Sequence, residues 1–267
     1  MHDMRCAMVI AKSVLLEAVR RKEVYVIIIL CCALIGVVMS LDFFGLHGLV
    51  KFYREVALQL MGISCALAVI LLATRQLPRE FEIKTIYPLL ARPVGRLTFL
   101  LGKGLGVCAA AAFCLALFML IYVAGILSLG GDLAWGLFLQ HIYLQMLQMA
   151  LLTAVCFMLS LLINYDAAMV IGFLFYSASG ILSSASLVLY DLTNNAGRAL
   201  LWLANYALPQ LVLFDLSKKV IHYEPALRAE LWRPLSFGIM AALTFYALCH
   251  TLLYGGVSYY LFRRRAL

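Results

Sequence analysis

The feature that most constrains this fold is the length of its uncharged stretches. The chain carries no charged residue between Lys103 and Asp132. An α-helix needs roughly 20 apolar residues to cross the hydrocarbon core of a bilayer, so this stretch alone predicts a transmembrane helix. Over all 267 residues, 65% are hydrophobic and 13% are charged, against about 45–50% and about 25% in soluble domains. The sequence therefore predicts an integral membrane protein.

Six stretches are long and apolar enough for this role, and they predict an all-α fold with six transmembrane helices in a single domain, 1–267. The predicted spans are about 24–44, 56–73, 97–129, 133–163, 167–190 and 235–262. A length of 267 residues accommodates these spans and their loops without a soluble catalytic domain.

Two further segments flank the spans. In residues 1–22, Ser13, Glu17, Arg20 and Arg21 share one helical face opposite apolar residues, which predicts an amphipathic helix in the membrane interface; a loose tail is the alternative. In residues 191–234, an apolar stretch at 200–216 is interrupted by Pro209. We expect short helical elements there, on the outer face between the fifth and sixth spans.

The distribution of positive charge predicts the orientation, because Lys and Arg collect in cytoplasmic loops. With the N-terminus inside, 14 of the 21 Lys and Arg residues fall on the inner side. Both termini and the segment 76–97 are then cytoplasmic. The net charge of +8 is better explained by anionic lipid headgroups than by nucleic acid, so we expect lipids and no nucleic acid as partners.

The segment 76–97 combines charge with rigidity. Ile83, Ile86, Tyr87 and Leu90 follow helical spacing, whereas Pro88 and Pro93 each break a preceding helix and suit the first turn of the next. This pattern predicts a short helix held at the cytoplasmic surface, where its charges face a partner. The alternative is an ordinary solvated loop.

The stretch "REFEIKTIYPLLARPVGRLTFLLGKGLG" (79–106) resembles the loop between the second and third helices of ABC-2 type permeases, the membrane subunits of bacterial ABC exporters. The residues that carry the resemblance are Glu80 or Glu82, Thr85, Leu89, Leu90, Pro93, Arg96, Gly102 and Lys103. Gly95 departs from the Ser that is usual in the family. Residues 205–217, "NYALPQLVLFDLS", resemble the outer segment of the family more weakly.

The resemblance implies a fold in which two permeases, identical or paralogous, form a dimer in the bacterial cytoplasmic membrane. It also implies a coupling helix that docks on a separate ATP-binding subunit, present in two copies. The coupling residues would be Glu80, Glu82, Lys84, Arg92, Pro93 and Arg96. ATP and Mg²⁺ would bind to the partner subunit, and this chain would bind no cofactor. The reason is that "LLGKGLG" lacks the upstream Gly spacing and the Ser or Thr of a phosphate-binding loop.

Polar residues in the predicted fourth span are candidates for a translocation path or a dimer interface. They are Gln140, His141, Gln145 and Gln148, of which the last three share one helical face. Polar groups at this depth are expected to face protein or a cavity rather than lipid. The alternative is that they form hydrogen bonds that only fix helix packing.

No catalytic or metal site is predicted. The eight cysteines form no CxxC motif, and the spans hold almost no carboxylates. The leading hypothesis is thus a non-catalytic permease subunit of an ATP-driven exporter. A membrane anchor that docks an ABC-type assembly without transporting is the alternative, and an intramembrane enzyme is a third and weaker hypothesis.

Overall fold

A computed structural model describes residues 2–20, 22–40, 45–82, 95–192, 194–195, 197–199, 208–221 and 234–264. Its longer elements are all α-helices, and no strand occurs in these residues. They are α1 (His2–Arg20), α2 (Lys22–Met39), α3 (Gly45–Glu82), α5 (Arg96–Ser128), α6 (Trp135–Leu162), α7 (Tyr165–Leu192) and α10 (Phe237–Arg264). The 3₁₀ helix η2 (Leu211–Phe214) and the short helix α9 (Ser217–Ile221) lie between α7 and α10. The predicted all-α fold is confirmed.

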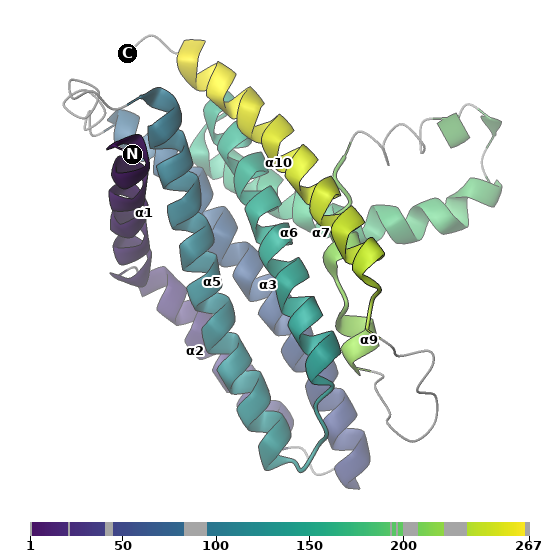
Figure 1. The fold of residues 1–267 in the computed structure, drawn as a ribbon. Helices are drawn as coiled ribbons and strands as arrows, with labels where there is room; N and C mark the ends of the chain where they lie inside the picture. Colours follow the sequence, from purple (N-terminus) through teal and green to yellow (C-terminus); the bar gives the residue numbers. More distant parts are fainter. Residues whose placement is uncertain are drawn as a thin grey trace.

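Helices α3, α5, α6 and α10 run alongside one another as a bundle, whereas the end of α7 projects to one side of it (Figure 1). The start of α1 and the end of α10 lie at the end of the bundle where α3 ends and α5 begins, and helix α1 lies against α5 at the same end (Figure 1). The turn between α5 and α6 lies at the opposite end.

Among the described residues, four helices are long and apolar enough to cross a membrane: Gly48–Phe81, Arg96–Ser128, Trp135–Leu162 and Phe237–Arg264. They correspond to the predicted second, third, fourth and sixth spans. In α7 the stretch Tyr165–Ile181 is apolar but shorter. The protein is therefore a membrane-embedded helical bundle.

Helix α3 is longer than the predicted span 56–73 at both ends. At its start, the buried guanidinium of Arg54 donates to the backbone oxygen of Asp132. At its end, the helix continues through Pro78 to Glu82, so residues 76–82 of the predicted coupling segment belong to α3. Charged residues extend the helix because partners distant in sequence satisfy them. The remainder of the predicted coupling helix, 83–94, lies outside the described residues.

Aromatic side chains join α3, α5 and α6 near the turn between α5 and α6. The hydroxyl of Tyr53 on α3 occupies the place where a Cβ on Gly125 would lie, and it donates to the backbone oxygen of Ile121 at 3.1 Å. The ring of Tyr122 stacks on Tyr53 and on Phe138, with centroids 6.2 and 5.0 Å apart. Gly125 thus permits the close approach of α3 and α5.

Within the predicted outer segment, part of the stretch 208–221 packs against the bundle. Leu211 and Phe214 of η2 are both 0% exposed. Phe214 belongs to a buried cluster with Leu144 of α6 and Ala247 of α10. Leu208, Val212 and Leu213 remain exposed, so this part of the predicted element has one buried and one exposed face, and residues 200–207 lie outside the described residues.

Candidate functional site

Glycines at the start of α5 form a groove for α1. A Cβ on Gly102 would lie 2.9 Å from the backbone oxygen of Ala7, and a Cβ on Gly106 would lie 2.5 Å from the Cβ of Val14. Such distances are shorter than van der Waals contact, so only glycine allows this approach. The two helices run in parallel here, because the earlier glycine meets the earlier part of α1. We call this contact, together with the charges beside it, the α1–α5 junction.

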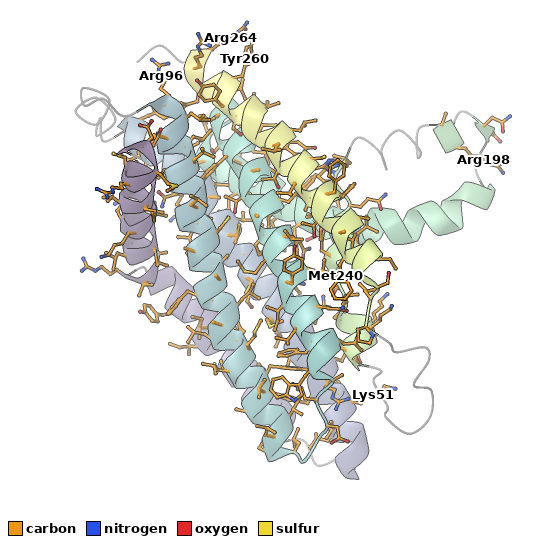
Figure 2. The ribbon with its side chains drawn as sticks, in the orientation of Figure 1. Lys51, Arg96, Arg198, Met240, Tyr260 and Arg264 are labelled. Atoms are coloured by element: carbon orange, nitrogen blue, oxygen red, sulfur yellow. The ribbon has the colours of Figure 1, made fainter. Side chains whose placement is uncertain are left out.

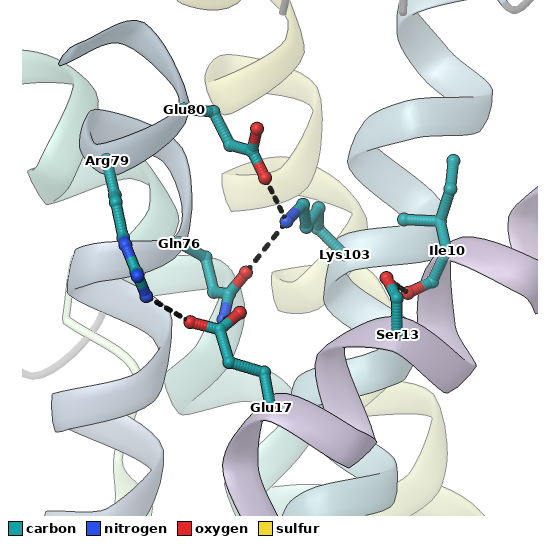
Figure 3. A network of polar contacts seen from close by, with 7 residues as sticks. All are labelled: Ile10, Ser13, Glu17, Gln76, Arg79, Glu80 and Lys103. Carbon is teal, nitrogen blue, oxygen red and sulfur yellow. Dashed lines mark hydrogen bonds and ion pairs between the residues drawn. The ribbon is translucent and has the colours of Figure 1, made fainter. Parts of the chain in front are cut away.

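A buried cation lies next to this groove. Lys103 of α5 is only 5% exposed, and its Nζ donates to the Oε1 atoms of Glu80 at 2.7 Å and of Gln76 at 3.0 Å (Figure 3). Nζ also lies 5.7 Å from the centre of the Phe99 ring, within range of a cation–π interaction. A charge buried at this depth requires such partners, and α3 supplies both acceptors.

The same network reaches helix α1. The Oε1 of Glu17 accepts from Arg79, and Oε2 of Glu17 lies 3.4 Å from Nε2 of Gln76 (Figure 3). Two carboxylates and two cations therefore connect the end of α3 with α1 and α5. A displacement of the α3 end would be transmitted to both helices through these contacts.

A polar cavity of about 280 Å³ lies further along the bundle, between α3, α6, α7 and the segment with η2 and α9. The side chains of Gln145 and Gln148 line it from α6, and Asp215 lines it from the residue that follows η2. Gln145 and Gln148 are 3% and 4% exposed. Within the described part of the chain, their carboxamide oxygens have no hydrogen-bond partner.

Sequence comparison decides the family. The profile of the ABC-2 family transporter proteins matches residues 18–188, a range that contains Arg79, Glu80 and Lys103 of the α1–α5 junction and the polar face of α6. The chain belongs to the ABC-2 family. None of the curated proteins matches it in sequence. Membership makes this chain a membrane component of a transport system, and the predicted resemblance is confirmed.

Of the predicted coupling residues of this ABC-2 family member, three lie in the described part of the chain and three lie outside it. Glu80 is paired with Lys103 inside the bundle, and Arg96 donates to the backbone oxygen of Arg263 at 2.9 Å. Figure 2 shows Arg96 beside the end of α10, at the opposite end of the bundle from Lys51. Glu82 is the last residue of α3. Lys84, Arg92 and Pro93 lie outside the described residues.

The polar residues predicted on α6 also separate. Gln140 has a packing role, since its amide bonds both backbone atoms of Leu235, with Nε2 to O at 3.0 Å and N to Oε1 at 2.8 Å. His141 is 1% exposed, and neither ring nitrogen has a partner in the described chain. Gln145 and Gln148 face the cavity. Gln140 instead contacts Leu235, two residues before α10 begins.

Sequence reasoning missed two residues of this site. Asp215 lines the cavity, although its place near the end of the apolar stretch 200–216 does not mark it as a site residue. Tyr176 of α7 also lines it, and nothing in its sequence context distinguishes it from other aromatic residues of the spans. No group of three or more His, Cys, Asp or Glu residues that could hold a metal ion occurs in the described ranges.

Proposed function

We propose that this protein is the permease subunit of an ATP-driven ABC exporter, which forms the translocation path as a dimer with an identical or paralogous permease. It would work with two copies of a separate ATP-binding subunit. The chain would cross the bacterial cytoplasmic membrane six times, with α2 and α7 added to the four helices described above, and both termini would be cytoplasmic.

The observation that carries this proposal is the α1–α5 junction. The charges of Glu17, Arg79, Glu80 and Lys103 connect three helices immediately beside the segment 83–94. Movement of an ATP-binding partner against that segment would act on α1, α3 and α5 together. Because interfaces and packed cores adopt discrete arrangements, a small displacement there can switch the helices that surround the cavity.

The location of the junction supports a cytoplasmic partner. The starts of α1 and α5 and the ends of α3 and α10 lie at one end of the bundle (Figure 1), and this is the side on which most Lys and Arg residues fall in the predicted topology. Since the sequence holds no phosphate-binding loop, ATP and Mg²⁺ would bind in the partner subunit, and this chain would carry no catalytic residue.

The polar cavity favours transport over a purely anchoring role. An anchor that only docks an ATPase has no requirement for a cavity of about 280 Å³ lined by buried amides. Unpartnered polar groups such as those of Gln145 and Gln148 reduce stability without compensation. Their presence is expected where a cargo passes or binds.

Purification of the chain from its native membrane in mild detergent, followed by mass spectrometry, tests the partner. We expect an ATP-binding subunit in an equal molar amount. Reconstituted into vesicles, the complex should hydrolyse ATP and move cargo, and an assembly that lacks cargo-stimulated hydrolysis would favour the anchor.

Charge reversal tests the coupling segment directly. Glu82→Lys or Arg92→Glu should uncouple ATP hydrolysis from transport while membrane insertion stays normal. Lys51→Glu at the opposite end of the bundle is the matched control and should leave coupling intact. Full transport by both variants would refute the assignment of the coupling residues.

A further inference from the structure

We propose that the polar cavity is a binding site for a small organic cation, whose ammonium group donates hydrogen bonds to Gln145 and Gln148 and pairs with Asp215. The site lies within one chain, among residues of α3, α6, α7 and the segment 208–221. It requires neither a second permease nor ATP, so the inference goes beyond the proposed function and does not depend on transport.

The size of the cavity is sufficient for a ligand rather than a single water. About 10–15 Å³ of such volume holds one water molecule, and the cavity offers about 280 Å³. That space is about the lower limit of known sites for small organic molecules. The ligand class is therefore a small molecule.

The charge of the lining determines the sign of the ligand. Asp215 is exposed and supplies a carboxylate, and no Lys, Arg or His is found among the described residues that line the cavity. His141 lies one turn before Gln145 and does not line it. Lys218 and Lys219 follow on α9 and are likewise absent from the lining. A cation is thus favoured, because the described lining holds a carboxylate and no basic side chain.

The buried amides supply the hydrogen bonds. The carboxamide oxygens of Gln145 and Gln148 have no partner in the described chain, and such unpaired acceptors cost free energy until a donor reaches them. Rotation of the terminal amide exchanges its oxygen and nitrogen, so each side chain can present an acceptor to the cavity. An N–H group of the ligand would satisfy these acceptors.

The remaining walls suit an organic body. Phe173 and Tyr176 line the cavity from α7, and Leu58 and Ile63 line it from α3. Aromatic faces attract cations in addition to apolar groups, and aliphatic side chains favour a hydrocarbon over a hydrated metal ion. The combination selects an amine with an apolar substituent.

The packed segment 208–221 fixes the position of the Asp215 carboxylate. Its Oδ1 accepts a hydrogen bond from the backbone N of Ser217 at 2.9 Å, and the flanking residues Phe214 and Leu216 are buried. The carboxylate is therefore held at the cavity by the packed segment 208–221 rather than carried on a loose loop.

Three probes of similar size and different charge test the proposal: benzylamine, benzyl alcohol and benzoate. Binding to the purified full-length permease in detergent is measured by calorimetry at neutral pH, without ATP and without a partner subunit. Benzylamine should bind at least tenfold more tightly than either of the other two. Equal affinities, tighter binding of benzoate, or no binding of benzylamine would overturn the proposal.

Variants locate the binding. Asp215→Asn should weaken benzylamine binding about tenfold and leave benzyl alcohol unchanged, and Gln145→Leu should weaken it several-fold. Asp132→Asn removes an exposed carboxylate outside the lining and is the matched control for charge. Unfolding of each variant is followed in parallel, and a preference for the amine that survives Asp215→Asn in a folded protein would also overturn the proposal. If the unmodified protein binds the amine but its reconstituted complex does not transport, only the proposed function is refuted.

Discussion

The α1–α5 junction and the polar cavity place similar kinds of side chain in opposite circumstances. At the junction, Lys103 is buried and paired with two acceptors, and Gly106 brings two backbones into contact. In the cavity, the amides of Gln145 and Gln148 are as deeply buried, yet their oxygens lack partners.

This difference shows how one helical bundle can hold its helices firmly together at one end and leave polar groups open to a ligand further along. Fully satisfied polar networks fix the relative position of helices, whereas an unsatisfied buried group is available to a ligand at the expense of stability. Substitutions at the junction should therefore lower stability as well as coupling, whereas substitutions in the cavity should act on binding and transport with little change in stability.

The largest loss of stability is expected for Gly106→Val. The added side chain would overlap Val14 and the backbone oxygen of Ala11, and overpacking of this kind costs about 3 kcal/mol. Thermal unfolding of the purified protein measures it. Gly104→Ala is the matched control, since its Cβ would meet Phe157 at an ordinary 3.6 Å and should not destabilise. Equal melting temperatures for both variants would mean that α1 does not pack in this groove.

A smaller loss, about 2 kcal/mol, is expected for Lys103→Met, because it leaves Glu80 without its cation. The effect falls below that of a fully buried pair because the side chain of Glu80 is 24% exposed. The double variant Lys103→Met with Glu80→Gln should recover part of the loss, as a double-mutant cycle of unfolding free energies will show. Strictly additive effects would contradict a direct pair.

Within the junction, the ion pair of Glu17 and Arg79 should matter less than that of Lys103. These side chains are 33% and 53% exposed, and solvent-exposed pairs contribute about 0.5 kcal/mol. Glu17→Gln should lower the melting temperature slightly at low salt and not at all at high salt. A loss as large as that of Lys103→Met would show that the pair is shielded from solvent.

In the cavity, Gln148→Leu should change the free energy of unfolding by less than about 1 kcal/mol, since no hydrogen bond within the described chain is lost. Transport by reconstituted vesicles should nevertheless fall strongly. Gln140→Leu is the contrasting variant, because it breaks two bonds to Leu235 and should destabilise the protein. Similar melting temperatures for the two variants would contradict the claim that Gln140 stabilises the fold and Gln148 does not.

The sequence predicts the helices that charge does not interrupt. The ends of α5, α6 and α10 fall within two residues of the predicted limits. Helix α3 extends further than predicted because Arg54 and Arg79 bind partners remote in sequence, which helical periodicity cannot reveal. The polar face of α6 was predicted from its spacing. The spacing does not predict that Gln140 bonds Leu235 while Gln145 lines the cavity, because these contacts depend on the neighbours that each residue meets after folding.

The burial of Lys103 and the role of Asp215 were beyond prediction for a related reason. Each residue lies next to an apolar stretch and has the sequence pattern of a boundary charge at the membrane surface. Tertiary packing determines the environment of each residue. Helix α3 brings Glu80 and Gln76 to Lys103, and the packing of η2 brings Asp215 to the cavity.

The central claim is that ATP-driven movement enters at the end of the bundle that carries the junction. A photo-reactive amino acid placed at position 84 or at position 51 in native membranes tests it, because both positions hold a lysine and Lys51 lies at the opposite end (Figure 2). Mass spectrometry identifies the adducts. We expect an ATP-binding subunit to be captured from position 84 and not from position 51. Capture from position 51 alone would contradict the claim.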